Sequence, residues 1–98
     1  MVRAVATICN KKGLHARAAA KVVKIAAAYP APIRLTRLLR ENEAGGEAPT
    51  AGGTSILSLL MLGADRGSEV AIEVEGPEAE AALHALLDLI ARKFDEEE

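Results

Sequence analysis

The sequence has few aromatic residues, one cysteine, no long apolar run and no strong excess of charge of one sign. Because only Tyr29 and Phe94 are aromatic, the interior must be built from Ala, Val, Leu and Ile. The lone Cys9 excludes an intrachain disulfide and a cysteine-rich zinc site. The longest apolar run, 59–64, contains a glycine and is far shorter than the roughly 20 residues that span a membrane. A formal net charge of -2, with acids and bases interleaved, argues against a nucleic-acid binder.

The length of 98 residues predicts a single domain, 1–98. An aliphatic core in a chain of this size is modest and leaves little room for a deep, enclosed active site. We therefore expect any chemistry to lie at the surface and to be completed by a partner protein. The first residues lack the apolar stretch of a secretory signal, so we expect a soluble, cytoplasmic monomer without metal, cofactor or membrane contact.

Periodicity predicts a βαββαβα order of elements. β-Branched or alternating residues predict strands, and strong helix formers with turn residues at their ends predict helices. The expected strands are 2–9, 33–36, a short one near residue 53, and 69–75, and the expected helices are 16–28, 56–62 and a long one starting at Pro77. A long mobile loop over 38–53 and a frayed tail over 95–98 are also expected. The fold class is α+β: an open-faced sandwich with a four-stranded antiparallel sheet covered on one face by three helices.

His15 is the residue best placed for chemistry, because it lies between the turn residue Gly13 and a helix. The first N–H groups of a helix have no intrahelical partner and, with the helix dipole, favour an anion. Neutral imidazole is a nucleophile near physiological pH. Arg17 adds a planar guanidinium that matches phosphate oxygens. The residues thus predict a nucleophile in an anion site.

Two segments then carry a resemblance to a known family. Residues 10–23, NKKGLHARAAAKVV, resemble the active-site segment of HPr, the histidine-containing phosphocarrier of the bacterial phosphotransferase system. Residues 53–63, GTSILSLLMLG, resemble the regulatory-serine helix of that family. The order and separation of the two segments and the βαββαβα pattern agree with the family over nearly the whole chain.

The resemblance implies a phosphoryl carrier rather than a self-sufficient enzyme. Enzyme I would phosphorylate Nδ1 of His15 from phosphoenolpyruvate, Arg17 would help to hold the phosphate, and a downstream EIIA-type protein would receive it. Ser55 matches the serine that an ATP-dependent HPr kinase/phosphorylase modifies in many members. The segment around Ser55 is somewhat closer to the nitrogen-type branch, in which the same chemistry regulates and does not import sugar.

Two features depart from the family pattern. Ala18 stands where the family commonly has proline, which would fix the first helical turn, although alanine is itself an excellent helix former. The loop 38–53 is longer than usual by roughly nine residues, which costs little stability because closure entropy grows logarithmically with length. We expect activity to survive the replacement of proline by Ala18.

The helix after Ser55 has one face for which two interpretations remain open. Ile56, Leu57 and Leu60 fall on this face, with Leu59 and Leu62 turned elsewhere. All of these side chains could belong to the core, or the first three could form an exposed docking patch beside His15, which the resemblance favours. A basic stripe of Arg17, Lys21 and Lys24 would surround that patch and attract acidic partners.

Other candidate sites and functions are weaker. His84 lies on the polar face of the closing helix, so we expect it to be exposed to solvent and to have no functional role. Cys9 is expected to be a small buried residue. A metal site from Cys9, His15 and His84 lacks sensible ligand spacing. The alternative function is a split-βαβ RNA-binding or protein-interaction module, but no predicted strand contains the aromatic residues that stack on bases.

Overall fold

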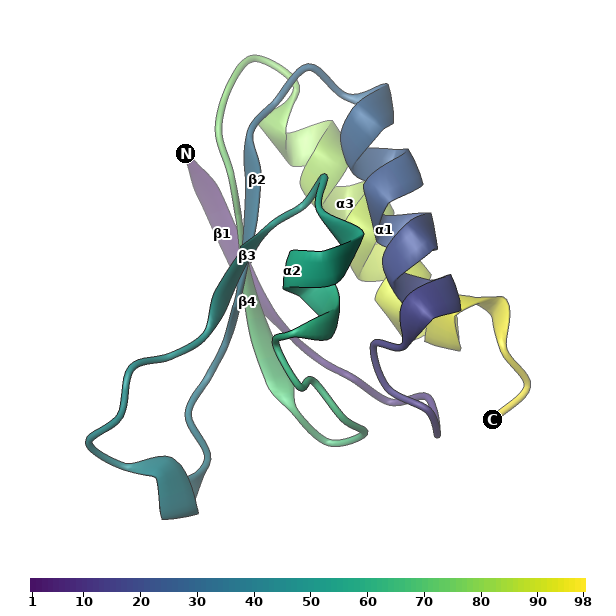
Figure 1. Ribbon diagram of the computed structural model, residues 1–98. Helices are drawn as coiled ribbons and strands as arrows, with labels where there is room; N and C mark the ends of the chain where they lie inside the picture. Colours follow the sequence, from purple (N-terminus) through teal and green to yellow (C-terminus); the bar gives the residue numbers. More distant parts are fainter.

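The protein is described by a computed structural model of residues 1–98, which contains a four-stranded sheet, three α-helices and two short 3₁₀ helices. In chain order the elements are β1 (Val2–Thr7), α1 (Ala16–Ala28), β2 (Ile33–Arg37), η1 (Glu41–Glu43), β3 (Thr50–Gly52), α2 (Ile56–Leu60), β4 (Glu69–Val74), α3 (Ala79–Ala91) and η2 (Lys93–Asp95). All three α-helices lie on the same side of the sheet (Figure 1). The predicted α+β open-faced sandwich is confirmed.

The sheet has the spatial order β1-β4-β2-β3, and each neighbouring pair is antiparallel. The central strand β4 is paired on both sides, so that Ile72 lies opposite Ala4 of β1 and Leu35 of β2. Val70, Ile72 and Val74 alternate toward the helices and are fully buried, as the period of two predicts. The alternation in this strand thus sets the register of the whole sheet.

β1 ends at Thr7 rather than at the expected Cys9. The hydrogen-bond ladder changes register at Ile8, whose N–H donates to Ser68 while its carbonyl accepts from Gly67. Side-chain patterns do not reveal a change of backbone partner of this kind.

The core lies between the sheet and the helices and is aliphatic apart from one ring. α1 contributes Ala18, Ala19, Val22 and Ala26, and Phe94 from η2 is completely buried and belongs to the same core cluster. None of the helices is long and apolar enough to cross a membrane.

Both later α-helices are shorter than predicted. α2 ends at Leu60, because the chain turns through Met61 and Leu62 to Gly63, whose positive φ of 65° lies outside the helical range. α3 begins at Ala79, so Pro77 lies in the preceding turn and not at the first helical position as expected. Glu78 is the N-cap of α3 and makes no side-chain capping bond.

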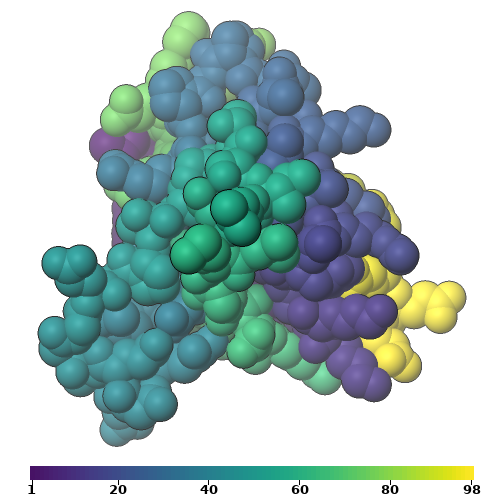
Figure 2. Space-filling view, viewed as in Figure 1, coloured from purple at the N-terminus to yellow at the C-terminus, as the bar shows by residue number.

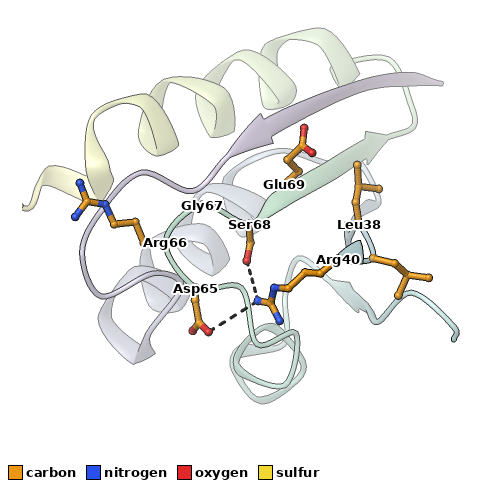
Figure 3. A pocket seen from close by; sticks show the side chains of 8 residues that line it. Leu38, Arg40, Asp65, Arg66, Gly67, Ser68 and Glu69 are labelled. Carbon is orange, nitrogen blue, oxygen red and sulfur yellow. Dashed lines mark hydrogen bonds and ion pairs between the residues drawn. The ribbon is translucent and has the colours of Figure 1, made fainter. Parts of the chain in front are cut away.

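The 38–53 loop is more structured than the mobile loop that its composition predicts. The 3₁₀ helix η1 is capped at its beginning, because the Glu43 carboxylate accepts the backbone N–H of Arg40 at 2.9 Å. The guanidinium of Arg40 then reaches the opposite turn, donating to Ser68 Oγ at 3.0 Å and pairing with Asp65 at 3.8 Å (Figure 3). Gly and Pro content indicates turns but does not indicate which charged side chains fasten a loop to its neighbours.

The C-terminal tail is not frayed, contrary to expectation. Residues 93–95 adopt left-handed φ values of 58°, 55° and 63°, which turn the chain sharply and insert Phe94 into the core. The apolar burial of the ring offsets the backbone strain. Beyond this turn, the carbonyl of Glu98 accepts the backbone N–H of Lys11 at 2.8 Å, so the tail lies beside the loop before α1.

Candidate functional site

A tight turn places His15 at the beginning of α1. Asn10 is completely buried, and its side-chain amide donates to the carbonyl of Gly13 at 2.8 Å. Gly13 has a φ of 66°, and a Cβ added there would lie 2.6 Å from the carbonyl oxygen of Ala64, so only glycine fits. The next amide, of Leu14, donates to this same Ala64 carbonyl at 2.9 Å. The turn is thereby held against the segment that follows α2.

His15 is the N-cap of α1. Its backbone is extended, its carbonyl accepts the first helical bond from Ala19 at 2.8 Å, and its ring Nδ1 accepts the backbone N–H of Arg17 at 3.3 Å. The contact at Nδ1 is exposed to solvent. The unpaired amides of the first turn therefore surround an accessible ring nitrogen with donors, the arrangement that favours an anion.

The other ring nitrogen faces the C-terminal tail. His15 Nε2 contacts the carboxylate of Glu96, whose other oxygen accepts the buried side-chain amide of Asn10 at 2.9 Å. Burial raises the pKa of Glu96, but the hydrogen bonds from Asn10 and His15 outweigh it and leave this pKa below its ordinary value. Glu96 does not stand out in the sequence, because nothing in an acidic tail distinguishes one glutamate from its neighbours.

The cations near His15 differ in their surroundings. Arg17 is exposed and its side chain has no hydrogen-bond partner, and Lys24 is exposed and forms no ion pair. Lys21, in contrast, donates to the carbonyl of Phe94 at 2.5 Å and lies 3.7 Å from Asp95. One member of the expected basic stripe therefore also holds the tail.

A shallow pocket lies between these cations and the tail. It is lined by Lys11, Lys12, Arg17 and Lys21 on one side and by the four acidic residues 95–98 on the other. Lys11 forms an ion pair with Glu98 across it, at 3.5 Å. The basic surface around His15 is thus partly neutralised within the chain.

α2 presents an exposed apolar patch. Ile56, Leu57 and Leu60 are 40%, 69% and 38% exposed, whereas Leu59 and Leu62 are buried. This is the division between faces that the docking interpretation requires. Met61, the C-cap of α2, is 75% exposed and extends the apolar patch, although the sequence did not single it out.

The patch lies on the same side of the molecule as the beginning of α1. Figure 2 shows α2, in teal and green, against the purple segment that leads into α1, with the yellow tail beyond it. Ser55 begins α2 as its N-cap, and its Oγ accepts the N–H of Ser58 at 3.2 Å. The two segments that carry the sequence resemblance are therefore neighbours in space.

Ala18 is the third residue of α1 and is completely buried. Its N–H has no backbone acceptor in the preceding turn, and the helical bonding begins at Ala19. The first turn is thus formed without proline, since the His15 cap supplies the bond that orders it.

The remaining candidates lie apart from His15. His84 is exposed on α3, and half-buried Cys9, just after β1, donates its thiol to the carbonyl of Ile90 at 3.5 Å. No three His, Cys, Asp or Glu side chains are grouped so that they could hold a metal ion. None of the four strands carries an aromatic side chain, which disfavours the RNA-binding alternative.

Comparison with known proteins identifies the family. A family model described as the phosphorylation site of the phosphotransferase-system HPr component matches residues 2–92. The chain is 41% identical over 92 residues to the phosphocarrier protein HPr of Pseudomonas aeruginosa, covering 94% of this chain and 93% of that protein. It is 36% identical over 96 residues to the phosphocarrier protein NPr of Escherichia coli, covering 98% of each. The crystal structure of HPr-C-His from Thermoanaerobacter tengcongensis matches with a TM-score of 0.82 at 35% identity and complete coverage of both chains.

Proposed function

The chain belongs to the HPr family of phosphotransferase-system phosphocarrier proteins, and we propose that it accepts a phosphoryl group from Enzyme I on His15. Enzyme I would draw this group from phosphoenolpyruvate, and a downstream EIIA-type protein would receive it, in the cytoplasm. The observation that carries the proposal is the exposed Nδ1 of His15 at the amide-rich beginning of α1.

The chemistry asked of the protein is limited to presenting a nucleophile and stabilising charge. Nδ1 carries a lone pair, because the N–H of Arg17 can only donate to it. The free amides of the first turn and the exposed guanidinium of Arg17 are donors for phosphoryl oxygens. The protein lacks an enclosed pocket at His15, so the partner enzyme supplies the remainder of the reaction site.

The exposed apolar patch of α2 is proposed as the docking surface for these partners. Ile56, Leu57 and Leu60 offer apolar area next to the reactive ring, and Lys24 offers a free positive charge on α1. Apolar patches rimmed by charge are typical of interfaces, and the charge steers an acidic partner.

Ser55 is proposed as a regulatory site for an HPr kinase/phosphorylase. A phosphoserine at a helix N-terminus is favoured by the dipole, while its charge of roughly -2 repels acidic partners. Because Ser55 directly precedes the apolar patch, that charge would be introduced at the docking surface. Label from ATP should be acid-stable and should be lost in Ser55→Ala; absence of incorporation would leave Ser55 only its capping role.

The experiment that tests the carrier function uses Enzyme I and labelled phosphoenolpyruvate. We expect one acid-labile phosphoryl group per chain, lost in His15→Ala and kept in the control His84→Ala. Label that persists in His15→Ala would refute the assignment. Relatives named HPr and NPr both match, so sugar-type and nitrogen-type EIIA proteins should be offered in parallel as acceptors. Because the segment around Ser55 resembles the nitrogen-type branch more closely, we expect transfer to the nitrogen-type protein to be the faster.

A further inference from the structure

The imidazole of His15 is held from two sides by different kinds of group. On the solvent side Nδ1 accepts a backbone N–H, and on the side of the tail Nε2 faces the Glu96 carboxylate. A carboxylate accepts hydrogen bonds, so the ring proton belongs on Nε2 and the lone pair on Nδ1. Both contacts therefore favour the same tautomer.

The position of Glu96 is built into the structure. One of its oxygens accepts from Asn10, a completely buried residue that also bonds the carbonyl of Gly13 in the turn before His15. The preceding residues are anchored by the buried Phe94 ring and by Lys21. The same buried amide thus ties the tail to the turn that presents His15.

We infer that Glu96 is a positioning residue for phosphoryl transfer, holding His15 as the Nε2–H tautomer so that Nδ1 keeps its lone pair, which accepts the N–H of Arg17 before transfer. This inference rests on the proposed function. In the step, the Nδ1 lone pair leaves its hydrogen bond with the Arg17 N–H and forms the bond to phosphorus. The bond from phosphorus to its donor atom in Enzyme I breaks and returns its electron pair to that atom. The Nε2 proton stays in place, and the Glu96 carboxylate balances the positive charge that the ring acquires.

The tail does not obstruct the reaction in this arrangement. Glu96 contacts Nε2, which is part-buried, whereas the Nδ1 contact remains exposed. Glu96 therefore occupies the nitrogen that does not react. If the tail only competed with partners for the site, removing the Glu96 carboxylate would speed phosphoryl transfer. A positioning role predicts slower transfer instead.

Glu96→Gln is the decisive variant, and Glu97→Gln is its matched control. Both remove one negative charge from adjacent residues, but Glu97 is exposed and makes no hydrogen bond or ion pair. A glutamine at position 96 has only one oxygen; with that oxygen facing Asn10, its NH₂ group faces Nε2 and favours the opposite tautomer.

Two measurements test the inference on full-length protein. The first is the ¹⁵N chemical shifts of the His15 ring, which report the tautomer of the neutral ring without any phosphoryl donor. The second is the single-turnover rate of transfer from phosphorylated Enzyme I. We expect Glu96→Gln to shift the tautomer away from Nε2–H and to slow transfer by about tenfold, as the loss of a charge-assisted hydrogen bond predicts. Glu97→Gln should match the wild type in both.

The outcomes separate this inference from the proposed function. If the wild type accepts phosphate on His15 but Glu96→Gln keeps the wild-type tautomer or the wild-type rate, the positioning role of Glu96 is wrong and the carrier function stands. A Glu96→Gln variant that transfers the phosphoryl group faster than the wild type would also overturn the positioning role. A wild type that accepts no phosphate from Enzyme I would refute the carrier function itself.

Discussion

The guanidinium of Arg37, at the end of β2, donates to both carboxylate oxygens of Glu43 in η1, at 2.7 and 3.0 Å. Arg37 is buried, and its Nε also donates to the carbonyl of Leu62 at 2.6 Å. The hydrogen bonds from Arg37 and from the backbone of Arg40 lower the pKa of Glu43 to about 2. The Arg37 side chain thus joins the long loop, the sheet and the turn that follows α2.

This pair predicts an acid-sensitive contribution to stability. Because folding lowers the pKa of Glu43 from an ordinary 4.5 to about 2, the contribution is complete above pH 4.5 and is lost as the pH falls toward 2. The difference in free energy of unfolding between wild type and Glu43→Gln should be largest near neutral pH and should shrink over that window. Denaturant titrations at several pH values measure it, with the exposed Glu47→Gln as control; a difference independent of pH would contradict the prediction.

Gly13→Ala should destabilise the protein and disturb His15. An added Cβ meets backbone atoms of Ala64 and Asp65 at 2.6 and 2.9 Å, and the positive φ is unfavourable for alanine. We expect a loss of at least about 2 kcal/mol in the free energy of unfolding and slower phosphoryl transfer. Gly52→Ala, which meets nothing within 4 Å, should stay within about 0.5 kcal/mol of wild type. Equal losses at the two positions would argue against the tight turn.

Leu57→Ser tests the apolar patch of α2. Leu57 is 69% exposed, so the substitution should leave unfolding nearly unchanged while weakening the interaction with Enzyme I. The rate of transfer at low protein concentration should fall by about fivefold, the effect of losing ~1 kcal/mol of docking energy. Leu39→Ser, at an exposed leucine of the 38–53 loop, is the control and should transfer at the wild-type rate. If both variants are equally slow, the docking surface has been misplaced.

Ser55→Ala removes the N-cap of α2. The lost bond from the Ser58 N–H should lower the free energy of unfolding by about 1 kcal/mol, whether or not any kinase acts on the residue. Ser55→Asn keeps a capping oxygen and should recover most of this loss. Thermal unfolding of the three proteins side by side measures both effects. An unchanged Ser55→Ala protein would mean that the cap contributes nothing to stability.

Local sequence patterns were sufficient for most of the fold and for one half of the site. The alternation in β4 and the helical repeats of α1 and α3 follow directly from which residues must be buried. The location of His15 after a turn glycine is likewise local, whereas the local pattern left open whether Ile56 is exposed, and the structure shows that it is, with Leu59 buried. Short-range geometry determines such features, so they can be predicted without knowing which distant segment packs against them.

Features that depend on distant partners could not be predicted in this way. The pairing of Arg37 with Glu43 orders a loop that composition describes only as turn-rich. The left-handed turn at Phe94 exists because the core has space for one ring, which no periodicity in an acidic tail reveals. In each case the deciding energy comes from contacts between segments.

The sequence by itself determined the order of elements and the presence of His15, with Arg17, at the beginning of a helix. Only the tertiary structure decided which atoms flank the two ring nitrogens. Nδ1 meets an amide two residues along the chain, whereas Nε2 meets the Glu96 carboxylate, 81 residues away. The second contact forms because burial of Phe94 returns the tail to the loop before α1, and such a closure depends on packing and not on local pattern.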